Sequence, residues 1–187
     1  MPTDAIELRA DAARNRDAVL AAAATAFATA TTEPSMRAIA RDAGVGIATV
    51  YRNFPTRQSL VDAVYRDQVH RLTNGADDLL QRLPPAQALR AWMDLFRDWL
   101  RTKHGMVDTL RSMIESGQSP HMETRDELLG AITSMLQAGA AAGELRSDVS
   151  ADDVAAGLIG IFTVASTRPD QSSRLLNILV DGLRPPA

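Results

Sequence analysis

The strongest constraint on the fold of this chain is the stretch at residues 36–57, MRAIARDAGVGIATVYRNFPTR. Ile39, Ala40 and Ala43 recur at helical spacing and predict a short helix with one apolar face. Gly44 follows where a helix commonly ends in a left-handed residue, because glycine adopts positive φ without steric cost. The pattern therefore predicts two short helices joined by a tight turn.

The second of these helices presents a surface that suits a DNA major groove. Val50 and Phe54 lie four residues apart, so both are expected to pack inward. The positions left for the outer surface and its flanks are Gly46, Ile47, Ala48, Thr49, Tyr51, Arg52 and Asn53. Small, polar and cationic side chains of this kind fit the groove and its phosphates. The motif is therefore predicted to be a helix-turn-helix that binds DNA.

The charge of this segment differs from that of the whole chain. The 187 residues carry a net charge of −3, which alone speaks against a nucleic-acid partner, because phosphate neutralisation supplies most nonspecific affinity. Within the motif, however, Arg37, Arg41, Arg52 and Arg57 stand against the single acid Asp42. A small basic surface on each copy is sufficient for DNA binding when two copies bind together.

The segment resembles the helix-turn-helix domain of TetR-type transcriptional regulators over roughly residues 14–72. The residues that carry the resemblance are Ile39-Ala40, Ala43-Gly44-Val45, Thr49-Val50-Tyr51, Phe54-Pro55, and then Arg57 and Leu60. Few helix-turn-helix proteins follow the second helix at once with Tyr-x-x-Phe-Pro, a basic residue and a leucine. The resemblance implies three N-terminal helices that bind DNA, a fourth linking helix, and a helical body for ligand and dimer contacts.

Individual contacts with DNA follow from the resemblance by position. Tyr51 and Arg57 match phosphate contacts of the family, and Arg57 stands where a lysine is more usual. Ser35 and Arg37 match positions that contact the DNA backbone. Residues 46–52 match positions that touch bases.

Two positions of the second helix differ from the others in how they match a DNA contact. Gly46 departs from the family, because Ser or Thr is common there and glycine brings no hydroxyl. Asn53 has two interpretations, a bidentate contact with adenine or an ordinary residue at the end of the helix.

The rest of the chain predicts helices throughout, because no segment alternates with period two for long enough to make a strand. Ser35 and Thr56 are expected to cap the helices that follow them. The other predicted helices cover residues 12–30, 56–83, 86–103, 106–116, 123–142, 152–166 and 173–183. We therefore predict an all-α protein with two domains: residues 1–83, a helix-turn-helix domain with its linking helix, and residues 84–187, a helical ligand-binding and dimerisation domain.

Aromatic and methionine side chains in the C-terminal half are candidates for a small-molecule pocket. They are Trp92, Met93, Phe96, Trp99, Leu110, Met113 and Met135. The alternative is that each is simply core, as such residues at helical spacing commonly are. Few charges lie on these stripes, so a largely apolar ligand is expected. Thr109, Ser112 and Gln118 are the candidates for polar contacts with it.

Small and leucine residues near the C-terminus are candidates for a dimer interface. They are Ala156, Gly157, Gly160, Leu175, Leu176, Leu179 and Leu183. The resemblance implies that the last two helices of each subunit form a four-helix interface, and the alternative is packing within one subunit. A dimer would read a palindromic DNA site.

Other classes of function find little support in the sequence. There are no cysteines, no Gly-rich phosphate loop, no HExxH and no GxSxG, and the three histidines are too scattered for a metal site. We therefore expect no enzyme activity, no cofactor and no metal. The N-terminus lacks the apolar run of a signal peptide and no stretch approaches a membrane span, so a cytoplasmic location is expected.

The sequence therefore predicts a homodimeric transcriptional repressor that is released from a palindromic operator by a small-molecule effector. An activator or a regulator without a ligand is the alternative within the same fold. From other classes, a helical enzyme of small apolar substrates and a helical interaction protein remain as alternatives. The first would show turnover without DNA, and the second predicts no sequence-specific, salt-sensitive DNA binding.

Overall fold

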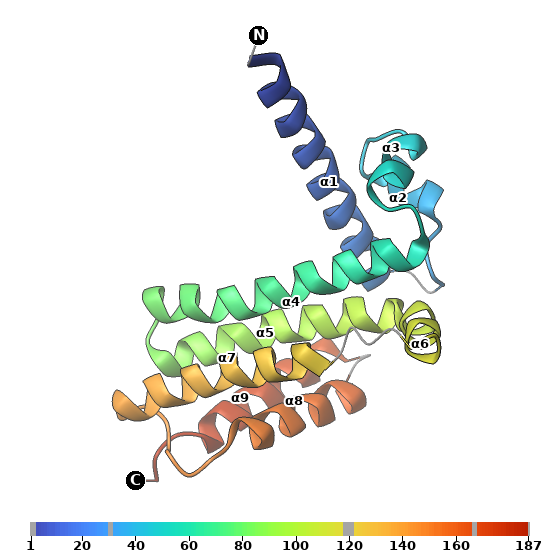
Figure 1. Ribbon diagram of the computed structural model, residues 1–187. Helices are drawn as coiled ribbons and strands as arrows, with labels where there is room; N and C mark the ends of the chain where they lie inside the picture. The colour runs from blue at the N-terminus through green and yellow to red at the C-terminus, as the bar shows by residue number, and fades with distance from the viewer. Residues whose placement is uncertain (1–2, 30–31, 118–121, 166–167, 187) are drawn as a thin grey trace. The chain divides into compact units, whose positions relative to one another are not determined.

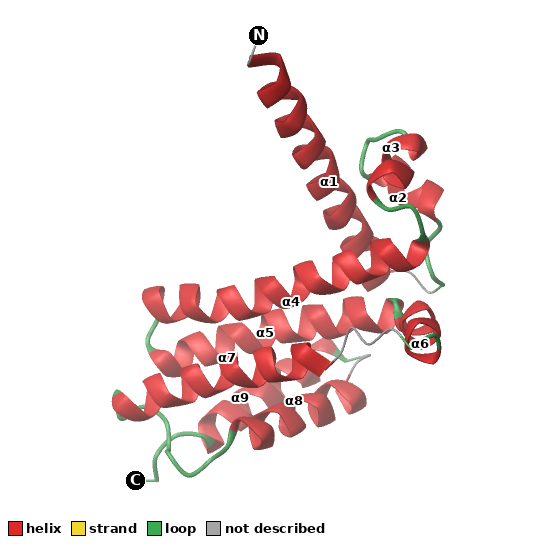
Figure 2. Ribbon diagram, in the orientation of Figure 1, coloured by secondary structure: helices red, strands yellow, loops and turns green. Residues whose placement is uncertain are grey.

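The computed structural model describes residues 3–29, 32–117, 122–165 and 168–186, and within these ranges the chain is helical with no strand (Figures 1 and 2). This confirms the predicted all-α fold. The helices are α1 (Thr3–Thr29), α2 (Met36–Asp42), α3 (Ile47–Asn53), α4 (Arg57–Arg82), α5 (Pro85–Gly105), α6 (Val107–Glu115), α7 (Met122–Ala141), α8 (Ala151–Ala165) and α9 (Pro169–Gly182).

The helix boundaries agree with the predicted ranges to within about two residues except at the starts of α1 and α9. Helix α1 begins at Thr3, well before the predicted start at Ala12. Its apolar periodicity becomes visible only where the helix becomes buried, at Val19 and beyond, so the polar first turns gave no signal.

Helix α9 begins at Pro169, ahead of the predicted start at Ser173, because proline fits the first turn of a helix and the apolar periodicity starts only later. Ala30 and Ser166, the predicted last residues of two helices, lie outside the described residues.

The chain divides into two compact units, and α4 and α5 contribute to both. The first unit comprises residues 1–68 and 100–120, and the second comprises residues 69–99 and 121–187. These compact units divide α4 and α5 and place α6 with the N-terminal helices. The functional division into a DNA-binding and a ligand-binding domain stays a prediction.

The first unit has its own apolar core, formed where α1, α2 and α3 pack against one another. Phe27 of α1, Ile39 of α2 and Val50 of α3 are all buried, and Phe54 is buried directly after α3. Each large apolar side chain buried in this way stabilises the fold by about 1.5–3 kcal/mol. The inward packing predicted for Val50 and Phe54 is confirmed.

Side-chain caps fix where α2 and α4 begin. The Ser35 hydroxyl accepts the backbone N–H of Ala38 at 3.2 Å, as predicted. Thr56 and Ser59 form a reciprocal cap at the start of α4, in which the Thr56 hydroxyl accepts the Ser59 N–H at 3.0 Å and the Ser59 hydroxyl accepts the Thr56 N–H at 3.1 Å. Both predicted caps are confirmed.

The second unit packs α8 between α7 and α9. Ile132 of α7, Leu158 of α8 and Leu176 of α9 are fully buried at its centre. The hydroxyl of Ser150 accepts the Asp153 N–H at 3.2 Å, and the Asp153 carboxylate accepts the Ser150 N–H at 3.1 Å, which caps α8. Within the described part of the chain, no helix combines the length and the apolar character needed to cross a membrane.

Candidate nucleic-acid interface

The turn between α2 and α3 is closed by backbone hydrogen bonds around Gly44. This residue has φ +68°, the left-handed conformation that glycine adopts most readily. Its N–H donates to the Arg41 carbonyl at 3.1 Å, and the Val45 N–H donates to the Ala40 carbonyl at 3.0 Å. The predicted helix-turn-helix geometry is therefore present in the structure.

The outer face of α3 displays most of the residues predicted to contact DNA. Tyr51 has half of its surface exposed, and Ala48 and Arg52 are also exposed. Ile47 and Thr49 are half-buried on the flanks of this face. A small side chain, an aromatic hydroxyl and a guanidinium together present contact groups for bases and phosphates.

Two polar residues at the end of α3 are held by Thr49. The Arg52 Nη2 donates to the Thr49 hydroxyl at 2.9 Å, which leaves the rest of the guanidinium for other partners. The Asn53 amide donates to the Thr49 carbonyl at 2.9 Å. Asn53 thus has the helix-end contact that was one of its two interpretations, and its contact with adenine stays a prediction.

The entrance to α3 is open and has room for a side chain. Gly46 occupies the N-cap with φ −66°, makes no side-chain cap, and a Cβ atom there would meet no atom within 4 Å. Glycine is therefore not required by the backbone at this position. Ser35 and Arg37, at the start of α2, are exposed as a DNA-backbone contact requires.

Arg57 differs from the other predicted contacts, because its guanidinium faces other parts of the protein. Its Nε lies 2.9 Å from the Glu33 carboxylate, and its Nη1 donates to the Pro34 carbonyl at 2.6 Å. The ring of Phe27 lies 5.7 Å from the guanidinium carbon. The side chain is 28% exposed, so the structure presents Arg57 as an internal contact more than as a free surface cation.

Sequence reasoning did not identify two of the residues in this region. Glu33 was not singled out, and Thr109 was considered only as a polar contact for a ligand. The Thr109 hydroxyl donates to the Glu33 carboxylate at 2.8 Å. The contact joins positions 76 apart in the chain, and no local pattern signals such a pair. Gln118, another candidate polar contact, lies outside the described residues.

The predicted pocket residues are buried, and part of them forms an aromatic cluster. The Phe96 ring centroid lies 5.6 Å from that of Trp92 and 5.2 Å from that of Trp99. Phe162 of α8, which the sequence analysis missed, joins the cluster at 6.1 Å. The Trp92 N–H donates to the Leu72 carbonyl at 2.8 Å. This satisfied hydrogen bond favours a core role for Trp92.

The other predicted pocket residues are distributed over both units. Met93 and Met135 are buried in the second unit. Leu110 and Met113 are buried in α6, which belongs to the first unit. The role of the whole set in binding a ligand stays a prediction.

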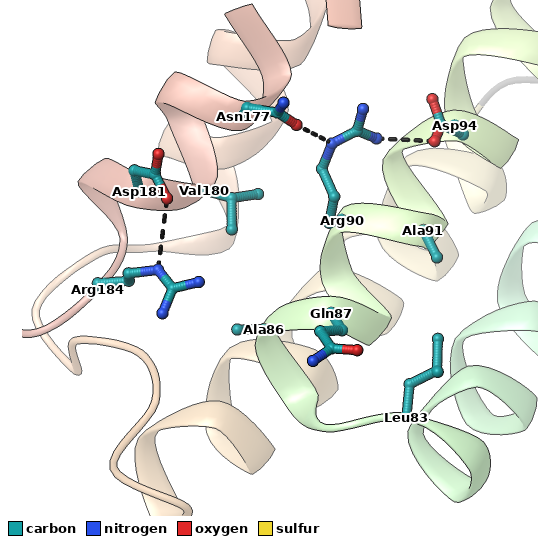
Figure 3. Close-up of a pocket in the computed structure, with 10 residues that line it drawn as sticks. All are labelled: Leu83, Ala86, Gln87, Arg90, Ala91, Asp94, Asn177, Val180, Asp181 and Arg184. Atoms are coloured by element: carbon teal, nitrogen blue, oxygen red, sulfur yellow. Dashed lines mark hydrogen bonds and ion pairs between the residues drawn. The ribbon is translucent and has the colours of Figure 1, made fainter. Parts of the chain in front are cut away.

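A surface groove of about 600 Å³ lies elsewhere, between the start of α5 and the end of α9 (Figure 3). It contains none of the predicted pocket residues. Arg90 crosses it, with Nε donating to Asn177 at 2.7 Å and Nη1 to Asp94 at 2.8 Å (Figure 3). Arg184 pairs with Asp181 at 3.4 Å on the same side. Since both cations already have acidic partners, the groove is polar without a net charge from these residues.

The predicted dimer residues fall into three groups. Leu176 and Leu183 are buried in the core of their own unit, which is the alternative considered for them. Gly157 lies against Leu179, where an added Cβ would be 3.5 Å from the leucine side chain, so this pair packs α8 on α9 within one subunit.

The third group of predicted dimer residues lies at or near the surface. Ala156 and Gly160 are exposed, and Leu175 is half-buried. Three further apolar residues on the same two helices, which were not predicted from the sequence, are exposed: Ile159 by 52%, Val164 by 76% and Ile178 by 65%. These three residues lie outside the buried apolar face of their helices, so the helical periodicity did not single them out.

Comparison with known families gives two matches along the chain. Residues 19–64 match the family model of bacterial regulatory proteins of the tetR family. Residues 84–185 match the model of the SbtR-like transcriptional regulator C-terminal domain. None of the curated proteins matches the chain.

Solved structures of similar sequence cover nearly the whole chain. A TetR transcriptional regulator from Streptomyces coelicolor, SCO0520, is 47% identical, with 92% of this chain and 99% of that chain covered and a TM-score of 0.85. A TetR regulatory protein from Mycobacterium vanbaalenii is 35% identical, with 95% and 99% covered and a TM-score of 0.74.

Proposed function

Because the chain belongs to the TetR family of DNA-binding transcription regulators, we propose that it is a homodimeric repressor that a small, largely apolar effector releases from a palindromic operator. The family is one of regulators rather than enzymes, so no catalytic step is needed. A repressor acts where the chromosome lies, and a cytoplasmic location is part of the proposal.

The observation that carries the proposal is the exposed face of α3, the second helix of the helix-turn-helix. Tyr51 and Arg52 are exposed on this face, while Val50 and Phe54 anchor its opposite side in the core. A rigid helix with a buried back and a polar front can enter a major groove without losing its own packing. We assign Tyr51 and Arg52 to contacts with the operator.

Dimer formation is supported by the unpartnered apolar residues of α8 and α9. Ile159, Val164 and Ile178 expose large apolar surfaces to solvent within one subunit. A second copy that covers them would remove this surface from water, and Ala156 and Gly160 would let its helices approach closely. Two reading helices would then meet two half-sites about one DNA turn apart.

The effector is proposed to bind among the C-terminal helices and to change the spacing of the reading helices through α4. By linkage, it can lower DNA affinity only as far as it prefers the conformation that does not bind DNA. Coupling of about 1–3 kcal/mol, or roughly 5- to 150-fold in affinity, is typical of allosteric proteins. An apolar effector is consistent with the aromatic and methionine residues of α5 and α7.

The experiment is a binding titration with the DNA just upstream of the coding region, with a scrambled duplex as competitor and a series of salt concentrations. A pool of randomised duplexes, from which the protein selects its own site, serves as the second probe. Saturable binding to a palindrome that resists the competitor supports the proposal. Failure to select any sequence from the randomised pool would overturn it.

The position of the selected site relative to the promoter separates a repressor from an activator. A site that overlaps the promoter supports repression, and a site upstream of it supports activation. Transcription from that promoter in vitro, with and without the protein, gives the sign directly. If the amount of transcript increases when the protein is added, the protein is an activator and not a repressor.

A further inference from the structure

We propose that Arg57 is a positioning residue: together with Glu33 and Thr109 it fixes the start of α2 and the start of α6 on the DNA-binding unit, and it does not contact a DNA phosphate. We call these three residues the Glu33–Arg57–Thr109 cluster. All three lie in the first unit, in the α1–α2 connection, at the start of α4 and in the first turn of α6. The inference rests on the proposed operator binding for its functional meaning.

The guanidinium of Arg57 makes its contacts within the protein. Arg57 Nε lies 2.9 Å from Glu33 Oε2 and 3.3 Å from the Thr109 hydroxyl oxygen. Its Nη1 donates to the Pro34 carbonyl at 2.6 Å, and its Nη2, which is buried and makes no hydrogen bond, forms an ion pair with Glu33 Oε2 at 2.9 Å. Charge-assisted contacts of this kind are about twice as strong as neutral ones. A phosphate would have to displace them.

The cluster also caps the N-terminus of α6. This helix begins after Met106, whose side chain makes no cap hydrogen bond. Glu33 Oε1 instead accepts the Thr109 N–H at 3.3 Å and the Thr109 hydroxyl at 2.8 Å. A carboxylate at the N-terminus of a helix is favoured by the exposed N–H groups and the helix dipole. Glu33 thus caps a helix from a segment far away in the sequence.

The cluster is also linked to the start of α2. Arg57 holds the carbonyl of Pro34, the residue directly before the Ser35 cap of α2. Holding this carbonyl therefore fixes the backbone immediately before the cap of α2. Loss of the cluster is therefore expected to loosen the first turn of α2 and of α6 together, while the rest of the fold remains.

The first experiment measures this loosening without DNA, by amide hydrogen exchange on the full chain. Arg57→Lys keeps the positive charge but lacks the planar fork that serves Glu33 and Pro34 at once. Thr109→Val keeps the shape and removes the hydroxyl. Both variants are expected to raise the exchange rates of the amides of residues 38 and 109, each taken relative to its intrinsic rate, about tenfold, the effect of weakening a helix turn by roughly the worth of one hydrogen bond.

The amide of Leu158, in the core of the second unit, is the internal control. A change confined to residues 38 and 109 supports the proposal. If their amides respond no more than that of Leu158, the variants only lower global stability and the proposal is overturned. This result does not depend on DNA, so it remains decisive if the wild-type protein binds no operator and the proposed function fails.

The second experiment uses a duplex that the wild-type protein has selected from the randomised pool, titrated over a range of salt concentrations. A phosphate contact contributes about one to the slope of log affinity against log salt concentration. Arg57→Gln is expected to weaken binding without changing this slope, and Arg57→Lys is expected to weaken it similarly. Arg37→Gln, which removes an exposed arginine, is the matched control and should reduce the slope by about one per subunit.

The opposite pattern would contradict the proposal. If Arg57→Gln reduces the slope as Arg37→Gln does, while Arg57→Lys restores both affinity and slope, then Arg57 acts as a point charge on a phosphate. Lysine can bind a phosphate, but it cannot contact Glu33, Pro34 and Thr109 at once. Arg57→Lys and Arg57→Gln therefore separate a positioning role from a phosphate contact.

Discussion

A Cβ atom added to Gly105 would lie 1.9 Å from the carbonyl oxygen of Phe27. The end of α5 and the end of α1 thus meet backbone to backbone in the first unit. No side-chain rotation can relieve this contact, because the atom in the way belongs to the main chain. We expect Gly105→Ala to lower the free energy of unfolding by about 1–3 kcal/mol, the usual cost of overpacking.

The matched control for this prediction is Gly130, in the middle of α7. A Cβ atom there would meet nothing within 4 Å. Gly130→Ala is therefore expected to raise the free energy of unfolding by about 0.5–1 kcal/mol, because alanine lowers the entropy of the unfolded chain and favours helix. Denaturant titrations of both variants test the pair. A stabilising Gly105→Ala would show that α1 and α5 move apart at no cost.

Removal of the exposed contact groups of α3 tests the reading surface. Tyr51→Ala and Arg52→Ala delete side chains that lie outside the core, so the melting temperature should change little. Operator affinity should fall by about 1–3 kcal/mol for a side chain that contacts a base. Affinity is measured by titration against the selected duplex. A folded variant with unchanged affinity would remove that side chain from the interface.

A hydroxyl introduced at the entrance of α3 should stabilise the helix. Gly46 is an N-cap with extended backbone and open space around it, so serine fits without strain. Gly46→Ser adds a side-chain acceptor for the first N–H groups of α3, which is worth a few tenths of a kcal/mol over glycine. Thermal unfolding measures the gain. A lower melting temperature would mean that the open space is closed by a rearrangement of the turn.

The local features of the fold were predictable, because each depends on residues close in sequence. Gly44 lies at a helix end that needs positive φ, and Val50 and Phe54 share one face of a helix, so their positions follow from spacing. Ser35 and Thr56 cap the helices that directly follow them. Beyond residue 72, the apolar periodicity of each segment predicted the remaining helices.

The features that were not predictable depend on residues far apart in sequence. Arg57 meets Glu33 across 24 positions and Thr109 across 52, and helical periodicity carries no information about such pairs. Trp92 is a second example. The apolar periodicity around Trp92 predicts that the side chain is buried, but it does not predict that the Leu72 carbonyl accepts the indole N–H. The exposure of Ile178 depends on how the neighbouring helices pack, which the sequence does not give.

Lys103 predicts a pH dependence of stability. Burial lowers the pKa of Lys103 below its ordinary value of 10.5, and its ammonium lies 6.0 Å from the centre of the Tyr65 ring. The folded state therefore holds the charge less favourably than the unfolded state. This cost is fully present below the folded pKa and disappears as the pH rises from there through 10.5.

Lys103→Met removes the titrating group and keeps its length. We expect the difference in unfolding free energy, wild type minus variant, to rise with pH between the folded pKa and 10.5 and to be constant at lower pH. Urea titrations of both proteins at pH 7, 9 and about 10.5 provide the comparison. A difference that falls over this range would mean that a partner stabilises the charged form of Lys103.

The last prediction concerns the proposed dimer. Ile178 on α9 is 65% exposed in one subunit, so replacing it by arginine disturbs no core packing. Within an interface, however, an unpaired charge would be buried, and the dimer should dissociate. Ile178→Arg is therefore expected to give a folded monomer whose operator affinity falls, because each reading helix would then bind a half-site alone.

The control is Ile114→Arg on α6, an equally apolar exposed position outside α8 and α9. Sedimentation velocity reports the mass of both variants. If Ile114→Arg dissociates the dimer and Ile178→Arg does not, the interface lies on α6 and not on α8 and α9.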